Sequence, residues 1–150
     1  MERFVFLSKE FFEMSEEVPL VEIERKQDRP YILLLVTVAG RTWGLPLRSN
    51  IRHPYAFWTD KPNRCGVDYS KAVLIDDPRY IDHERRPHIR DREFRALKGS
   101  EHAVRRGFEA YARSYAKARR SGHPRYDALV RYSTLQNYED VLGIEGAGEA

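Results

Sequence analysis

Hydrophobic positions in the first half of the chain follow the patterns of β-strands. Residues 31–38 (YILLLVTV) are apolar almost throughout and rich in β-branched side chains, which predicts a strand covered on both faces. The Ala-Gly pair that follows is a tight-turn signal, and residues 41–47 (RTWGLPL) then alternate, with Trp43, Leu45 and Leu47 on one face. These segments predict a hairpin. Pro46 has no N–H to donate, so it predicts an edge or a bulge near the end of the second strand.

In the second half of the chain, the apolar residues recur at the spacing of an α-helix. From Ser100 onward, apolar side chains recur at helical spacing, at Val104, Phe108, Tyr111, Tyr115 and Ala118. Gly122 and Pro124 predict the end of this helix, the longest, which lies near residues 100–120. The stripe places Tyr111 and Tyr115 in the core.

Weaker patterns predict the remaining elements. We expect a first strand at residues 3–8, a helix capped by Ser8, a strand at residues 70–76, and a short helix at the end of the turn-rich segment 77–94. A further short helix at residues 126–132 precedes a turn capped by Ser133. Residues 54–68 are dense in turn residues and predict a long loop.

The elements together predict an α+β protein, with a small, strongly bent antiparallel sheet near the N-terminus and helices added later. A length of 150 residues favours a single domain over residues 1–150. Residues 145–150 (EGAGEA) are expected to form a frayed tail.

Charge is unevenly distributed along the chain, although the net charge is only +3. Residues 98–131 carry nine basic side chains against three acidic ones. Four of these cations form a row at i, i+7, i+11 and i+14 of the predicted helix, namely Arg106, Arg113, Lys117 and Arg120. A basic block in an otherwise balanced chain indicates a polyanionic partner, with a merely solvated helix face as the alternative.

Several function classes find no support in the sequence. It contains no zinc, calcium, Walker or dinucleotide motif, and its five histidines are scattered, so we expect no metal site and no cofactor. The first residues do not resemble a signal peptide, and the longest apolar stretch is about half a membrane span. With a single cysteine, these features predict a cytoplasmic protein with no membrane partner.

The run RSNIRH at the end of the second hairpin strand is the best candidate for chemistry. It offers Arg48, Ser49, Arg52 and His53, which supply cations, a hydroxyl and an imidazole at the end of a rigid strand. This set suits the cleavage of RNA by its own 2′-hydroxyl, because the substrate then supplies the nucleophile. A structural polar turn is the alternative.

Three segments carry a resemblance to a known family. They are residues 29–57 (RPYILLLVTVAGRTWGLPLRSNIRHPYAF), 66–75 (GVDYSKAVLI) and 131–144 (RYSTLQNYEDVLGI). They resemble the toxins of type III toxin–antitoxin systems, the ToxN/AbiQ-like endoribonucleases, and most of all the TenpN and CptN branches.

The resemblance implies a fold, an activity and a partner. The expected fold is a barrel-like core related to Kid/MazF, with added helices. The expected activity is metal-independent RNA cleavage that leaves a 2′,3′-cyclic phosphate, with a role in phage defence. The expected partner is a small structured antitoxin RNA, which the toxin cuts from a repeated precursor and binds in a ring-like complex.

The resemblance also implies site residues. Ser49 carries over from the family's hydroxyl-containing segment, but Arg48 replaces the preceding hydroxyl and Ile51 replaces a lysine. The basic role then falls to Arg52 or His53. The family's base and aromatic residue near the preceding strand correspond to Lys26, Arg29 and Tyr31, and Lys71 and the helical row (Arg106, Arg113, Lys117 and Arg120) complete the expected RNA-binding set. A non-catalytic RNA-binding module on a small β-barrel remains the alternative.

Overall fold

The computed structural model describes residues 3–17, 20, 22 and 31–144. Its strands are β1 (Arg3–Leu7), β2 (Leu33–Val38), β3 (Arg41–Arg48), β4 (Ala56–Asp60), β5 (Cys65–Asp68), β6 (Val73–Leu74) and β7 (Ile81–Asp82). Its α-helices are α1 (Lys9–Glu17), α2 (Asp91–Leu97), α3 (Glu101–Ser121) and α4 (Asp127–Arg131). Short 3-10 turns are η1 (Tyr69–Lys71), η2 (Pro78–Tyr80), η3 (Pro124–Tyr126) and η4 (Thr134–Asn137). None of the described helices is long and apolar enough to span a membrane.

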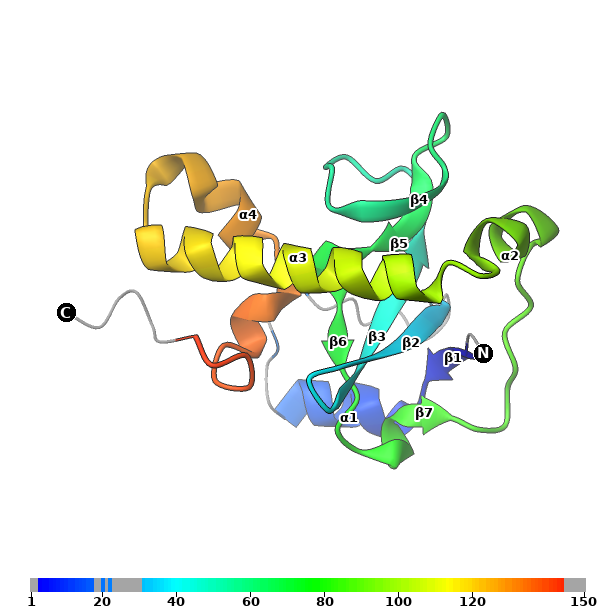
Figure 1. Ribbon diagram of the computed structural model, residues 1–150. Coiled ribbons are helices and arrows are strands. Elements are labelled where there is room, and N and C mark those ends of the chain that lie inside the picture. Colours follow the sequence, from blue (N-terminus) through cyan, green and yellow to red (C-terminus); the bar gives the residue numbers. More distant parts are fainter. Residues whose placement is uncertain (1–2, 18–19, 21, 23–30, 145–150) are drawn as a thin grey trace.

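The strands form one antiparallel sheet, as Figure 1 shows, and the α+β prediction is confirmed. The strand order is β4-β5-β3-β2-β1-β7, with β6 pairing beside β3. The path has two ends, β4 and β7, and the sheet does not close on itself. The Kid/MazF-like barrel core that the resemblance implies is therefore not confirmed.

The central hairpin follows the sequence pattern. β2 pairs with β3 from Leu33↔Pro46 to Val38↔Arg41. The turn between the two strands has positive φ angles of 52° at Ala39 and 76° at Gly40. The Ala-Gly signal therefore predicted the turn correctly.

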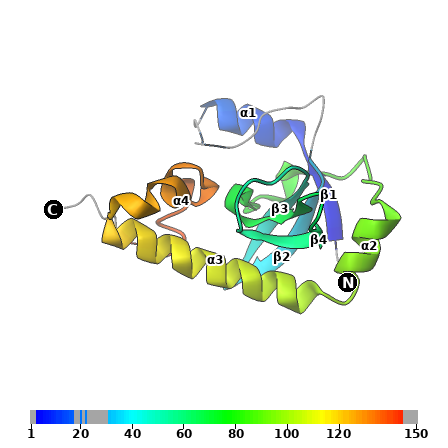
Figure 2. The ribbon, with the colours of Figure 1, turned by 90° about the horizontal axis from the view of Figure 1, so that it is seen from above.

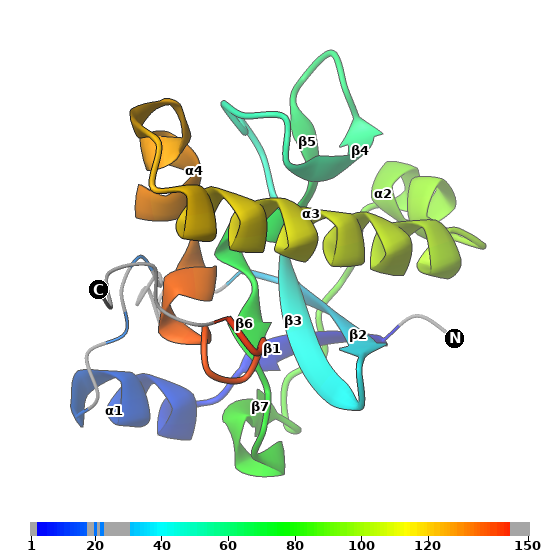
Figure 3. The same ribbon diagram turned by 60° about the vertical axis from the view of Figure 1, so that its left-hand side comes forward.

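The segment between β5 and β6 leaves the sheet where it would otherwise pair with Pro46 of β3. The N–H of Leu47 donates to the carbonyl of Ile32 on the β2 side, so the backbone of the alternate residue Pro46 faces the other edge of β3. On that edge β5 pairs with the end of β3 and β6 with its beginning, as Figure 3 shows for β6. The turn η1 bulges out between β5 and β6. The sequence predicted an edge or a bulge at Pro46. β3 itself is continuous there, and it is the pairing on this edge that is interrupted, because residues 69–72 leave the sheet.

Helices cover both faces of the sheet, as Figure 2 shows for α1 and α3. On the α3 side, Trp43 packs at 5.4 Å from the rings of both Phe108 and Tyr138. On the α1 side, Phe11 and Leu33 belong to a second buried cluster. Burial on both sides explains why β2 is apolar almost throughout.

The long helix and the C-terminal turn confirm the sequence predictions. All five apolar positions of the α3 stripe are buried. The hydroxyl of Tyr111 donates to Ser133 Oγ at 2.6 Å, and that of Tyr115 donates to Glu139 at 2.6 Å. Ser133 Oγ also accepts the N–H of Leu135, which makes it the cap of η4. The C-terminal segment is thereby fastened to α3.

Two predictions were wrong. Residues 54–68 are not a loop but contain the β4–β5 hairpin, because the turn residues concentrate between Asp60 and Cys65 and leave strand on either side. Gly66 permits close pairing, since a β-carbon there would lie 2.3 Å from the carbonyl oxygen of Phe57. The expected strand at residues 70–76 is reduced to Val73–Leu74 by η1.

Candidate functional site

The run RSNIRH is divided between two pockets. Asn50 has a positive φ of 55° and Ile51 is buried, so the chain turns sharply and presents its polar side chains on two sides. Arg48 and Ser49 line a pocket of about 260 Å³, called here the Tyr31 pocket, whose polar lining is Tyr31, Arg48, Ser49, His88, Arg90 and Glu93. Arg52 and His53 line a cavity of about 530 Å³, called here the Tyr132 cavity, together with Tyr55, Ser70, Tyr126 and Tyr132.

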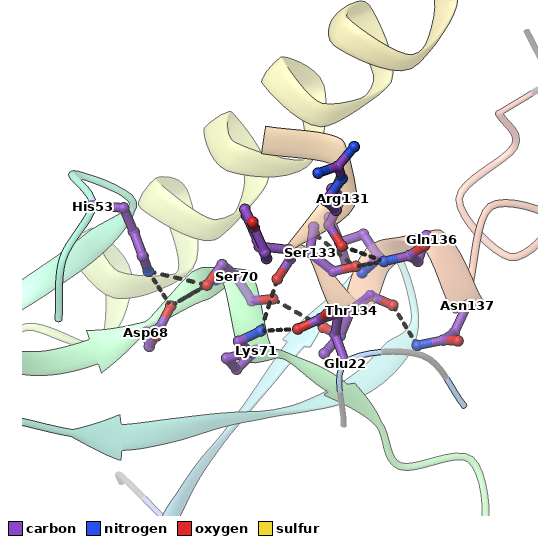
Figure 4. A network of polar contacts seen from close by, with 12 residues as sticks. Glu22, His53, Asp68, Ser70, Lys71, Arg131, Ser133, Thr134, Gln136 and Asn137 are labelled. Atoms are coloured by element: carbon purple, nitrogen blue, oxygen red, sulfur yellow. Dashed lines mark hydrogen bonds and ion pairs between the residues drawn. The ribbon is translucent and has the colours of Figure 1, made fainter. Parts of the chain in front are cut away.

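Asp68 is the buried charge between the two pockets. It is the only fully buried charged side chain among the residues that the structure describes. Its Oδ2 accepts a hydrogen bond from Arg48 Nη1 at 2.8 Å. Its Oδ1 accepts from the hydroxyl and the backbone N–H of Ser70, at 2.6 and 2.9 Å, and lies 3.1 Å from His53 Nε2, as Figure 4 shows for His53 and Ser70. One carboxylate therefore orients side chains of both pockets.

The charges of Asp68 and Arg48 stabilise each other. Burial by itself raises the pKa of Asp68, but hydrogen bonds from His53, Ser70 and Arg48 outweigh it and hold this pKa below its usual value. Burial likewise opposes the charge of Arg48, yet the hydrogen bond to Asp68 raises the pKa of Arg48 above its usual value. The guanidinium is thus permanently charged, and it lies 5.4 Å from the centre of the Tyr31 ring.

Hydrogen bonds fix the tautomer of His53. Its Nδ1 accepts the backbone N–H of Tyr55 at 3.0 Å, so the ring proton lies on Nε2 and points to Asp68. Ser70 Oγ lies 3.1 Å from the same Nε2 and gives its own proton to Asp68. His53 therefore has no lone pair facing Ser70, and these residues do not form the relay of a serine hydrolase.

The Tyr31 pocket collects side chains from four parts of the chain. Tyr31 comes from the segment before β2, Arg48 and Ser49 from the end of β3, His88 and Arg90 from the segment before α2, and Glu93 from the first turn of α2. Ser49, His88 and Arg90 are exposed. The His88 ring has no hydrogen-bond partner among the described residues. The pocket thus offers two guanidinium groups, a hydroxyl, an imidazole and a carboxylate around one space.

Lys71, one of the expected RNA-binding residues, forms hydrogen bonds to other residues of the protein. Its Nζ donates to the carboxylate of Glu22 at 3.0 Å and to the backbone carbonyl of Tyr132 at 2.8 Å (Figure 4). Lys71 therefore ties the end of α4 to η1. Lys26 and Arg29 lie outside the described residues.

The cations of the helical row are all exposed on α3 and line neither pocket. At about 100° per residue, Arg106, Arg113, Lys117 and Arg120 lie on the side of the helix opposite the buried stripe. The row is therefore a separate surface, with its charges directed away from the sheet.

The structure adds residues that the sequence did not single out, namely Asp68, Ser70, His88, Arg90, Glu93, Arg125 and Tyr132. Asp68 and Ser70 could have been suspected, because Asp-x-Ser at the end of an apolar strand is typical of a side-chain-to-backbone turn. His88 and Arg90 carry no such local signal.

The described residues contain no group of three His, Cys, Asp or Glu side chains that could hold a metal ion. No family model, no curated protein and no solved structure matches the chain.

Proposed function

We propose that the protein is a metal-independent endoribonuclease and that its reaction takes place in the Tyr31 pocket. The observation that carries this proposal is the position of Arg48, which Asp68 holds beside Ser49 in the same pocket as His88 and Arg90. In the reaction, the 2′-hydroxyl of the RNA attacks the adjacent phosphorus. The bond to the 5′-oxygen breaks, and the products are a 2′,3′-cyclic phosphate and a free 5′-hydroxyl.

Each side chain has a role that follows from its chemistry. Glu93 accepts the proton of the 2′-hydroxyl, because an ionised carboxylate is an acceptor. His88 donates a proton to the leaving 5′-oxygen. Arg48 and Arg90 stabilise the negative charge that develops on the phosphorane, and Arg48 needs no rearrangement because Asp68 already holds it in place. Ser49 donates a hydrogen bond to a non-bridging phosphate oxygen.

More widely, we propose that the protein is a toxin of a type III toxin–antitoxin system that acts in the cytoplasm and defends against phage. Its core would then be related to Kid/MazF, with the pairing of β5 and β6 to β3 interrupted at η1. The partner is a small structured antitoxin RNA, processed from a repeated precursor and bound in a ring of toxin and RNA units. The exposed row on α3 supports an RNA partner, because aligned cations can follow a phosphate backbone.

The test is RNA cleavage by the purified protein in excess EDTA, with Ser49→Ala prepared in the same way to control for contaminating ribonucleases. We expect the wild-type protein to cut single-stranded RNA and Ser49→Ala to be inactive but folded. A 5′-phosphate on the downstream fragment, or activity that depends on a divalent ion, would contradict the mechanism. RNA that is bound but not cut by the wild-type protein would identify a non-catalytic RNA-binding module.

A further inference from the structure

We propose that the Tyr132 cavity binds one unpaired nucleotide, with its base between tyrosine rings and its phosphate on Arg52 and Arg125. The inference rests on the proposed function in one respect, since it takes an RNA strand as the natural ligand. The cavity is distinct from the Tyr31 pocket, and the reaction proposed above uses none of its residues.

The size and the walls of the cavity suit a nucleotide. Its volume of about 530 Å³ lies in the range of small-molecule sites. Tyr55, Tyr126 and Tyr132 line it, and Tyr132 is 54% exposed, which makes it one of two large exposed hydrophobic side chains in the described part of the chain. Stacking on such rings requires a base that is not paired in a duplex.

The charges of the cavity favour an anion. Arg52 and Arg125 are both exposed and both line it, and none of the described lining residues is acidic. Arg125 is held over the ring of Tyr126 at 4.8 Å and donates to the hydroxyl of that residue at 2.8 Å. A guanidinium fixed next to an aromatic ring is suited to bind a phosphate beside a stacked base.

The rim of the cavity is fixed before any ligand binds. Lys71 donates to the backbone carbonyl of Tyr132, and Thr134 Oγ1 donates to the carbonyl of Ala72 and lies 3.3 Å from that of Ser70. The backbone around Tyr132 is therefore fastened to η1 while its ring remains exposed. A site that is already ordered loses less entropy when a ligand binds.

Asp68 places the cavity next to the proposed reaction site. Arg48 in the Tyr31 pocket and His53 in the Tyr132 cavity bind to opposite oxygens of this one carboxylate. A strand whose scissile phosphate lies on Arg48 can therefore place a neighbouring nucleotide in the cavity. The cavity then supplies a contact to a base, which the cations of the Tyr31 pocket do not supply.

The test measures the binding of adenosine and cytidine 5′-monophosphates and of a short oligodeoxyribonucleotide, which lacks the 2′-hydroxyl and cannot be cut. Tyr132→Ala should weaken binding by about tenfold or more, as expected for the loss of one stacked base. Tyr132→Phe should bind like the wild-type protein. Phe94→Ala is the matched control, because Phe94 is the other large exposed hydrophobic residue, is 47% exposed, and lies on α2 outside both pockets.

Arg125→Ala should weaken the binding of the nucleotides but not that of the corresponding nucleosides, which lack the phosphate. The inference is overturned if Tyr132→Ala and Arg125→Ala bind all probes like the wild-type protein, or if Tyr132→Phe loses as much affinity as Tyr132→Ala. These measurements do not depend on cleavage. An inactive protein that still shows the Tyr132 and Arg125 effects would refute the proposed nuclease while supporting the cavity as a nucleotide site.

Discussion

The side chain of Tyr69 lies against Gly107 of α3, where a β-carbon would stand 2.2 Å from the phenol oxygen. The Tyr69 hydroxyl donates to the backbone carbonyl of Val104 at 2.9 Å, so the ring is held tightly on the helix. Tyr69 lies between Asp68 and Ser70 in the chain. The close contact with α3 therefore fixes the segment that joins the two pockets.

Gly107→Ala should destabilise the protein by on the order of 1–3 kcal/mol, because the added methyl group overpacks the contact with Tyr69. In the interior of an exposed helix the same change normally stabilises by about 1 kcal/mol. The measurement is denaturant unfolding. Ser114→Ala, at an exposed position of α3, is the control and should leave stability within a few tenths of a kcal/mol, roughly as helix propensities predict.

Repeating Gly107→Ala in a Tyr69→Phe background should reduce its cost, because the nearest atom is then missing. The relief is partial, since the ring carbons of Tyr69 would still lie 2.9 and 3.1 Å from the new β-carbon. An equal cost in both backgrounds would show that the phenol oxygen does not limit the space at residue 107.

Asp68→Asn should lower stability at neutral pH by on the order of 3 kcal/mol, because it removes the buried partner of Arg48 and His53. The pKa of Asp68 is lowered in the folded protein, so its contribution is present above the unfolded pKa of about 3.9 and is lost as pH falls through the folded value. The difference between wild type and variant should therefore shrink below about pH 4.

Urea unfolding from pH 3 to pH 8 checks this prediction, with Ser114→Ala expected to run parallel to the wild-type protein. If the difference in unfolding free energy between Asp68→Asn and the wild-type protein stays constant over the whole pH range, the ionisation of Asp68 does not stabilise the fold.

His88→Gln should lower kcat for RNA cleavage by roughly 10²–10⁴-fold, the range typical of general acid–base catalysis, and leave KM nearly unchanged. His83→Gln is the control, because His83 is also exposed but lines neither pocket. Single-turnover kinetics separate binding from chemistry. A rise in KM at constant kcat would make His88 a binding residue and not a proton donor.

Replacing both Arg113 and Lys117 by Ala should weaken the binding of long RNA and flatten its salt dependence by about one unit, since each phosphate contact contributes roughly −0.7 to the slope for single strands. Cleavage of a short substrate should be spared, because the row lines neither pocket. The control replaces Lys9 on α1 and Arg79 on η2, two exposed cations that line neither pocket. An equal loss in both double variants would show that only net charge matters.

Local sequence determined the hairpin and the long helix. An apolar segment before the Ala-Gly turn and an alternating segment after it are sufficient to pair β2 with β3, because a two-residue turn brings its flanking strands together. The stripe from Val104 to Ala118 determined the buried face of α3, because helical period alone places these side chains on one side. Pro46 predicted an irregular edge of β3, an edge or a bulge, since a missing N–H is a property of the residue itself.

Only the tertiary structure decided how the candidate site is assembled. The sequence suggested one cluster at residues 48–53, but the positive φ of Asn50 separates Arg48 and Ser49 from Arg52 and His53. His88, Arg90 and Glu93 reach the Tyr31 pocket from a distant segment. Arg125 and Tyr132 reach the cavity from η3 and from the end of α4. The spacing of apolar residues along the sequence indicates which side of a helix or strand is buried. It does not indicate which other element packs against that side, because this depends on how the whole chain folds.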